Sequence, residues 1–144
     1  MSNVLRKMFK TVPSLEEKGV VIEYGEGVEI TVARAGGANK KFARMLTRLT
    51  KPHRRAIQTE TVPEGVEKKI VMETYANSIV KDWKGITKDI ITGDDADAEI
   101  QLECTAENII AVFEALPDLF EDVAKCSQNI SLYRAEILEA DSGN

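Results

Sequence analysis

The sequence predicts an α+β protein that is mostly α-helical, with an N-terminal β-hairpin followed by a bundle of about four to five helices. β-Branched residues concentrate between residues 19 and 34, whereas apolar residues recur at helical spacing through most of the remaining chain. A short acidic, β-like insert interrupts the helical part. With 144 residues the chain has the length of a single domain. We divide it into a hairpin at 19–34, helices at 38–84, the acidic insert at 86–104 and C-terminal helices at 105–139.

Composition excludes several classes of protein. Apolar residues make up 43% and charged residues 30% of the chain, a globular balance that argues against disorder. No apolar run is long enough to span a membrane, and the first residues lack the apolar stretch of a secretory signal. We therefore expect a soluble cytosolic protein without a membrane partner. Two cysteines and one histidine offer neither a disulfide framework nor the spacing of a zinc site.

The hairpin is predicted from alternation and from its turn. Val28, Ile30 and Val32 alternate with other residues, as in a strand with one buried face. The preceding run at residues 19–24 is also rich in β-branched residues, and Gly-Glu-Gly at 25–27 supplies turn residues between the two runs. Two antiparallel strands joined at residues 25–27 follow from this pattern.

Two helices are predicted between the hairpin and the insert. Asn39 can cap the first, which carries an apolar face to residue 51 and ends or bends at Pro52. After Pro63 a longer helix is indicated, because the apolar residues from 66 to 83 stay on one stripe. Gly85 then ends this helix.

The acidic insert is predicted as a turn between two short strand-like segments, residues 86–91 and 99–104. Acidic residues at alternate positions from Asp95 invite comparison with a calcium loop. The comparison fails, because Ile100 stands where that loop needs glycine and Ala106 stands where it needs a bidentate glutamate. We therefore expect no calcium site in the insert.

Two further helices are predicted after the insert. Thr105 has the position of a helix cap, and Pro117 separates the short helix that follows from the last one. In the last helix, apolar residues recur at alternating spacings of four and three, as in a helix that packs along another helix. This seam is interpreted either as a core face or as a surface shared between subunits. Its members are Leu119, Val123, Cys126, Ile130, Tyr133 and Ile137.

Charge is unevenly divided along the chain. Residues 1–93 hold 17 Lys and Arg against 11 Asp and Glu, whereas residues 94–144 hold 2 against 13. This division is either neutralised within the folded monomer or attracts the basic part of one copy to the acidic part of the next. The basic residues gather in one stretch that contains no acidic residue: Lys40, Lys41, Arg44, Arg48, Lys51, Arg54 and Arg55.

The basic stretch predicts one positive helix face, for which a solvated surface is the simplest explanation. Binding of nucleic acid is disfavoured, because Phe42 is the only aromatic residue in the stretch and the whole chain carries a net charge of −5. A small regulatory protein that binds an acidic or nucleic-acid partner through this face stays an alternative, which salt-dependent binding to DNA would support.

The search for catalytic motifs finds no glycine-rich phosphate loop and no serine elbow. His53 lies in a basic turn and is interpreted as a surface residue rather than a general base. Cys104 and Cys126 lie in apolar contexts and are interpreted as small buried residues rather than activated thiolates. We therefore expect no enzymatic activity, no metal and no cofactor.

Three parts of the chain, in this order and together with the basic helix that follows the first of them, resemble the tail assembly chaperones of long-tailed bacteriophages. They are the hairpin end Ile-Thr-Val-Ala-Arg at 30–34, the tract Tyr-Ala-Asn-Ser-Ile-Val-Lys-Asp-Trp-Lys-Gly-Ile at 75–86, and the asparagine-containing segment at 105–123, which includes Leu-Pro-Asp-Leu-Phe. The resemblance spans most of the chain. The sequence departs from these proteins in the insert, where a short turn becomes the acidic stretch at 94–99.

The resemblance implies a non-catalytic phage protein that binds the long, apolar tape measure protein, keeps it soluble and helps to recruit tail tube subunits. Such a protein acts in the host bacterial cytoplasm, associates with itself or in many copies along the tape measure, and is absent from the mature virion. In such families a ribosomal frameshift often appends a second domain, and this chain would be the short form. The alternative is a structural tail protein, a tube or tail-completion subunit, retained in the virion; the helical pattern disfavours it, because such subunits are usually strand-dominated.

Candidate contact residues follow from apolar phase and from charge. Trp83 is in phase with the apolar stripe of its helix, so it is either a core residue or an interface anchor. Phe113 and Phe120 lie beside the seam of the last helix. The candidates for a partner or self-association surface are Trp83, Phe113, Leu119, Phe120, Val123, Ile130, Tyr133 and Ile137. The candidates for electrostatic contact are Lys40, Lys41, Arg44, Arg48, Lys51, Arg54 and Arg55.

Overall fold

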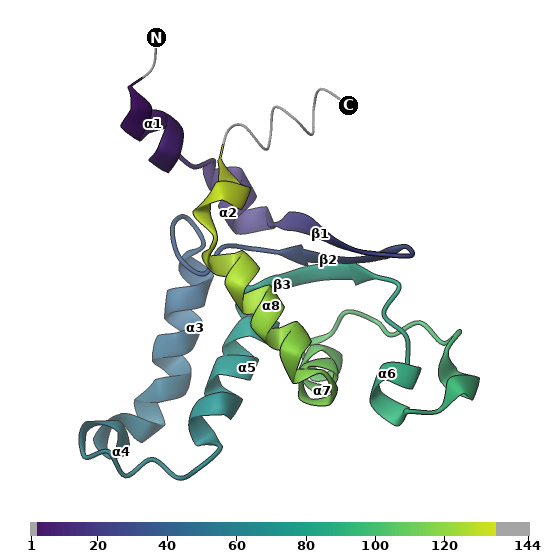
Figure 1. The fold of residues 1–144 in the computed structure, drawn as a ribbon. Helices are drawn as coiled ribbons and strands as arrows, with labels where there is room; N and C mark the ends of the chain where they lie inside the picture. Colours follow the sequence, from purple (N-terminus) through teal and green to yellow (C-terminus); the bar gives the residue numbers. More distant parts are fainter. Residues whose placement is uncertain (1–2, 135–144) are drawn as a thin grey trace.

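A three-stranded antiparallel sheet organises the fold (Figure 1). The computed structural model describes residues 3–134. The strands are β1 (Val20–Gly25), β2 (Val28–Val32) and β3 (Val80–Lys84), in the order β1-β2-β3. Apolar residues of β2 and β3 join residues of three helices in one core cluster. The predicted α+β class is confirmed, although the helices pack on a sheet instead of forming a bundle alone.

The helices vary greatly in length, and two of them precede the hairpin, where the sequence analysis predicted none. None of the described helices is long and apolar enough to cross a membrane. The α-helices are α1 (Val4–Phe9), α2 (Pro13–Lys18), α3 (Lys40–Thr50), α4 (Arg54–Gln58), α5 (Val66–Ser78), α6 (Asp89–Thr92), α7 (Ala106–Ala115) and α8 (Pro117–Gln128). The 3₁₀ turns are η1 (Lys51–His53), η2 (Asp95–Asp97) and η3 (Ile130–Tyr133). Figure 1 shows that α3 and α5 form a helical hairpin that extends away from the sheet, with α4 at its far end.

The predicted β-hairpin is confirmed, including its turn. Ile22 pairs with Ile30 across the two strands. Gly25 and Gly27 have φ of 94° and 80°, a left-handed region that glycine enters without the steric cost of a Cβ atom. Glycine at both ends of the turn therefore lets the chain reverse within a few residues.

The helix predicted after residue 39 is confirmed as α3, but Asn39 does not cap it. The Asn39 side chain accepts no hydrogen bond from the first turn of α3. The residue is only 4% exposed, and its Nδ2 donates to the carbonyl oxygens of Arg34 at 2.8 Å and Ser78 at 2.9 Å. Asn39 therefore joins the loop before α3 to the end of α5.

The loop at residues 33–39 also contacts the helices on either side of it. The N–H of Ala35 donates to the carbonyl oxygen of Ser127 near the end of α8, at 2.9 Å. Arg34 forms a hydrogen-bonded ion pair with Glu16 of α2, whose carboxylate is buried. Polar contacts with α2, α5 and α8 thus converge on this one loop.

The helix predicted to continue to Trp83 ends at Ser78, so that prediction is wrong beyond this point. Residues 80–84 form β3, which pairs with β2 and contains a bulge at Lys81. A bulge adds one residue to one strand and changes the faces of the residues around it. Val80 and Trp83 are therefore both buried although they are three positions apart, a spacing that in the sequence indicates a helix.

The strands predicted at 86–91 and 99–104 are wrong. The two segments form one isolated β-bridge, between Thr87 and Gln101, and no strand ladder. The first segment runs into α6, and η2 lies between the two segments. Residues of this insert satisfy their hydrogen bonds locally; Asp94, for example, caps η2 by accepting the Ala96 N–H at 2.9 Å. The acidic insert is therefore a helical loop instead of a β-turn.

Trp83 connects the insert to the core through a side-chain hydrogen bond. Its Nε1 donates to the carbonyl oxygen of Leu102 at 2.8 Å, and the residue is only 8% exposed. Two backbone hydrogen bonds close the neck of the insert: Leu102 N–H donates to Ile86, and Lys88 N–H donates to Ile100, both at 2.8 Å. Trp83 is thus a core residue of the monomer, one of the two interpretations that its sequence position allowed.

The C-terminal helices start where the sequence predicts, but the last one is shorter. Thr105 caps α7, its Oγ1 accepting the Asn108 N–H at 3.2 Å, and Pro117 begins α8. α8 ends at Gln128, because Asn129 has an extended backbone and its side chain caps the 3₁₀ turn η3. The prediction of one continuous helix through residues 130 and 133 is therefore wrong.

The 3₁₀ turn η3 returns the chain to the sheet. Tyr133 is completely buried, and its hydroxyl donates to the carbonyl oxygen of Val32 at 3.0 Å. Its own carbonyl oxygen accepts the Val12 N–H at 2.7 Å. Tyr133 therefore joins the segment before α2 to the sheet. Ile137, the last member of the predicted seam, lies outside the described residues.

Replacement of Asn39 by alanine is expected to lower the free energy of unfolding by about 1–3 kcal/mol, because two buried carbonyl oxygens lose their donor. Urea unfolding followed by circular dichroism measures the change. The matched control is Gln58→Ala at the exposed end of α4, which should stay within about 0.5 kcal/mol of the wild type. Equal stability of the two variants would contradict the role given to Asn39.

Trp83→Phe keeps an aromatic ring in the core but removes the donor to Leu102. We expect a loss of about 1 kcal/mol in global stability and faster hydrogen exchange at the amides of Lys88 and Leu102. Tyr24→Phe is the control, because it removes a surface hydrogen bond to Asp122 and should leave exchange in the insert unchanged. Unchanged exchange in the Trp83 variant would show that the indole does not fasten the insert.

Candidate interaction surfaces

Four of the seven predicted partner residues that the structure describes lie in the interior of the monomer. Phe113, Val123 and Tyr133 are at most 1% exposed, and Trp83 is 8% exposed. The remaining described members of the set are half-buried: Leu119, Phe120 and Ile130. The core interpretation therefore holds for the fully buried residues, which are not accessible to a partner in this conformation.

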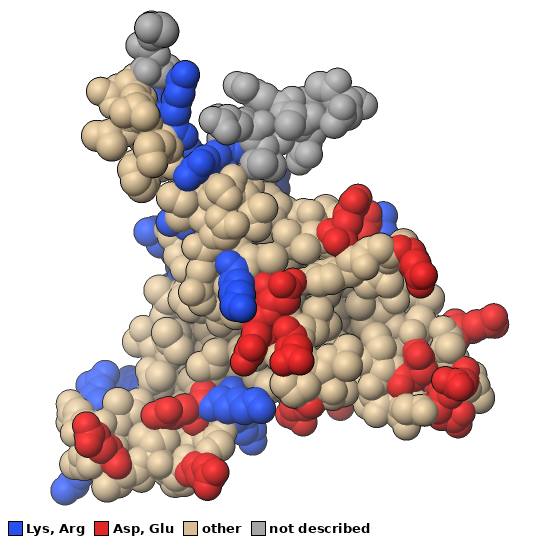
Figure 2. All heavy atoms as spheres, in the orientation of Figure 1, with Lys and Arg blue, Asp and Glu red and all other residues tan. Residues whose placement is uncertain are grey.

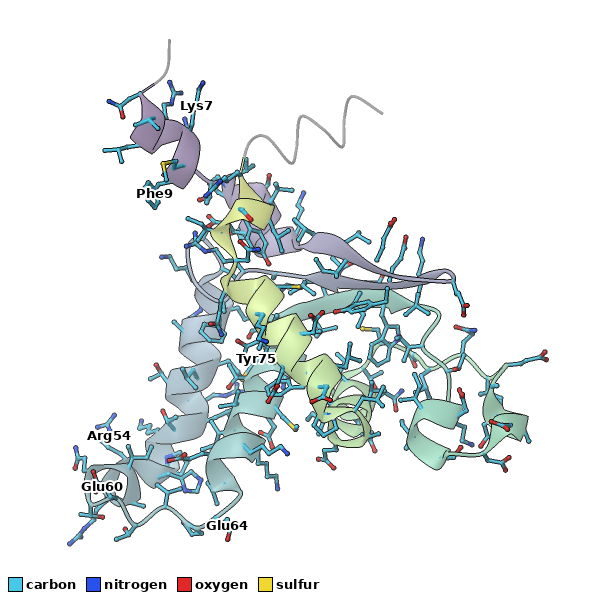
Figure 3. All side chains as sticks on the ribbon, in the orientation of Figure 1. Lys7, Phe9, Arg54, Glu60, Glu64 and Tyr75 are labelled. Atoms are coloured by element: carbon cyan, nitrogen blue, oxygen red, sulfur yellow. The ribbon has the colours of Figure 1, made fainter. Side chains whose placement is uncertain are left out.

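Aromatic rings from four helices form a cluster that includes Tyr75, whose position Figure 3 marks. The Tyr75 ring meets the rings of Phe42 and Phe120 edge-on, with centroids 5.9 Å and 5.4 Å apart. Phe113 lies 5.1 Å from Phe120. Because these residues come from α3, α5, α7 and α8, the cluster fixes the helices relative to one another. Phe113 and Phe120, two predicted contact residues, thus contribute to packing within the monomer.

The predicted electrostatic residues form one exposed set, which we call the basic surface. It follows α3, η1 and α4, and all of its members are exposed: Lys40, Lys41, Arg44, Arg48, Lys51, Arg54 and Arg55. Within residues 3–134, none of the seven takes part in an ion pair. Partial burial, with a smaller contribution from the nearby Lys41, lowers the pKa of Lys81, and Glu17 opposes this shift. Arg54, Glu60 and Glu64 all lie at the far end of the helical hairpin (Figure 3).

A groove of about 360 Å³ lies between α3, η1 and α5, and we call it the α3–α5 groove. Four of its lining residues are apolar and three carry or can carry positive charge, against one carboxylate. The apolar residues are Leu49, Pro52, Val66 and Ile70, and the others are Arg48, His53, Lys69 and Glu73. A shallower hollow of about 430 Å³ on α3 shares Arg48 with the groove and includes Arg44 and Lys51. Apolar and basic groups are therefore adjacent on this side of the molecule.

The short helix α1 exposes a row of large apolar side chains. Val4, Leu5, Met8 and Phe9 are 63%, 61%, 45% and 59% exposed, and no residue of α1 is buried. The helix extends away from the sheet, with Lys7 and Phe9 on opposite sides of it (Figure 3). The sequence contained a signal for this helix, because the apolar positions recur at helical spacing after the cap residue Asn3.

The insert carries negative charge at the other side of the fold. Asp94, Asp95, Asp97 and Glu99 lie there, and Ile91 and Ile100 are 39% and 47% exposed beside them. We call residues 91–100 the acidic end. Figure 2 shows acidic side chains over this region and over α8, basic side chains around the N-terminal helices, and both basic and acidic side chains at the α3–α4 end.

Within residues 3–134, no ion pair joins the basic part of the sequence to its acidic part. Within the described part of the chain the ion pairs are Arg34 with Glu16, and Lys84 with Glu29 at 3.9 Å. Both pairs join residues that precede the acidic end. The basic surface and the acidic end therefore remain separate features of the monomer.

The two thiols have environments that oppose ionisation. Burial, with a smaller contribution from the Asp82 carboxylate, raises the pKa of Cys104 to about 11. Burial and Asp122 likewise raise the pKa of Cys126. Both thiols stay protonated at neutral pH, although the two residues are half-buried and not fully buried as predicted. Among residues 3–134 no three His, Cys, Asp or Glu side chains lie close enough together to hold a metal ion.

The comparisons with known proteins identify one family. The family described as YdaY prophage protein matches residues 37–144. No curated protein and no solved structure matches the chain. The matched region begins just before α3 and includes the basic surface, the α3–α5 groove and the acidic end, whereas α1 and the β-hairpin precede it.

Proposed function

The chain belongs to the YdaY prophage protein family, and we propose that this phage-associated protein is a tail assembly chaperone. In this proposal it is non-catalytic, binds the tape measure protein, keeps it soluble and helps to recruit tail tube subunits. It acts in the cytoplasm of the host bacterium and is absent from the mature virion. Its sequence resemblance to tail assembly chaperones and its membership of a prophage family support this role.

The observation that carries the proposal is the exposed apolar face of α1. A chaperone for a long apolar chain must present apolar surface that its own core does not use. Val4, Leu5 and Phe9 meet this requirement, since each is more than half exposed while the core is closed by other residues. A helix that protrudes from the sheet is also free to lie against a helical partner.

Small contact surfaces are an advantage for this role. A six-residue helix can bury only a modest apolar area, so one contact is weak. Many copies along one tape measure would still hold it, because several linked binding sites give a much higher overall avidity than one site alone. Weak single contacts also allow the copies to leave when tube subunits arrive. The α3–α5 groove offers additional apolar surface on another side of the molecule.

Co-expression with the tape measure protein of the same prophage tests the proposal. We expect the tape measure protein to be soluble and to co-purify with the wild-type chain, and to precipitate when expressed alone. Leu5→Gln with Phe9→Gln should reduce the co-purified amount by about tenfold or more, because two exposed apolar contacts are lost.

Arg6→Gln with Lys7→Gln is the matched control, because it changes two exposed positions of the same helix to the same residue without removing an apolar side chain. It should co-purify like the wild type. Equal behaviour of the two double variants would remove α1 from the contact. A tape measure protein that precipitates with every form of the chain, together with detection of the chain in purified virions by mass spectrometry, would favour a structural tail protein instead.

A further inference from the structure

We propose that the α3–α5 groove binds the acidic end of a second copy of this chain, so that copies associate head to tail. The inference deepens the proposed function and rests on it for its biological purpose, which is to line up many copies on one long partner. The contact itself involves only this chain and is testable without any partner.

The groove has the chemistry to bind an acidic segment with apolar side chains. Leu49, Val66 and Ile70 provide apolar surface, and Arg48 and Lys69 stand beside it with Glu73 as the one opposing carboxylate. The basic surface continues the positive charge from the groove along α3 and α4. An acidic ligand would therefore be attracted to this side. An apolar side chain on that ligand would be transferred from water to the apolar surface of the groove.

The acidic end has the complementary chemistry. Ile91 and Ile100 are exposed among Asp95, Asp97 and Glu99. The backbone around Ile100 is held in place, since its N–H donates to Asp97 at 3.1 Å and its carbonyl oxygen accepts the Lys88 N–H at 2.8 Å. An exposed apolar side chain on a fixed backbone loses little conformational entropy on binding. The acidic end is therefore suited to insertion into a groove.

The two surfaces cannot satisfy each other within one molecule. Figure 1 places α4 and α6 at opposite sides of the fold, and no ion pair within residues 3–134 joins the basic surface to the acidic end. Contact between two different surfaces is heterologous, so each added copy leaves one groove and one acidic end free. Repetition of this contact produces a row or a ring of copies, as a protein that covers a long partner requires.

Charge reversal on each surface provides the test. Variant A carries Arg44→Glu and Arg48→Glu, and variant B carries Asp95→Lys and Glu99→Lys. Each variant alone should associate about 100-fold more weakly than the wild type, because like charges then face each other. An equimolar mixture of A and B should regain association, since the groove of either variant is opposite in charge to the acidic end of the other. Sedimentation velocity at low salt measures all three samples.

Lys10→Glu with Lys18→Glu is the control for net charge. It introduces the same change of charge as variant A at exposed positions outside both surfaces, and it should associate like the wild type. Wild-type association should also weaken as salt rises, because exposed charges are screened. Ile100→Gln, at a residue that is 47% exposed, should weaken association without lowering stability.

The inference is overturned if the wild type is monomeric at all concentrations and salt levels, or if the mixture of A and B stays as weak as each alone. Its failure is distinguishable from failure of the proposed function. A monomeric chain that still keeps the tape measure protein soluble would overturn only the head-to-tail contact. A chain that associates as expected but leaves the tape measure protein insoluble would overturn only the chaperone role.

Discussion

The buried amide of Asn39 sets the direction of the helical hairpin, and the surfaces on that hairpin depend on it. Its two N–H groups donate to carbonyl oxygens of Arg34 and Ser78, one in the loop after β2 and one at the end of α5. Carbonyl groups at the end of a helix have no partner within the helix, so a side-chain donor satisfies an otherwise costly position. α3 begins directly after Asn39. The orientation of α3 at this point therefore positions the basic surface and the groove, which lie on α3 and its neighbours.

The sequence was informative where structure depends on neighbouring residues. The hairpin and the cap of α7 by Thr105 depend on local glycine and hydroxyl chemistry, and both were predicted correctly. β3 was missed because a bulge at Lys81 buries Val80 and Trp83 at a spacing that is also helical. Only the pairing with β2 decides whether residues 80–84 form a strand or a helix, and such pairing is not visible in one sequence.

The candidate surfaces likewise divide into those that depend on neighbouring residues and those that depend on contacts between distant segments. The exposed basic set was predicted in full, because long charged side chains at helical spacing are rarely buried. Apolar spacing alone could not separate a core stripe from an interface, and the structure places Phe113, Val123 and Tyr133 in the core. The α3–α5 groove could not be predicted, since its walls come from helices whose relative position is set by Asn39 and the aromatic cluster.

The separation of core from contact surfaces has a consequence for assembly. Because the tightly packed aromatic and aliphatic residues hold the monomer together, the groove, the acidic end and α1 can bind and release partners without unfolding it. Charge on opposite sides of the molecule orients an approaching copy and speeds its encounter, while the small apolar areas limit how long the contact lasts. A surface that combines fast, oriented encounter with weak retention is suited to a protein that covers a long chain and is then displaced from it.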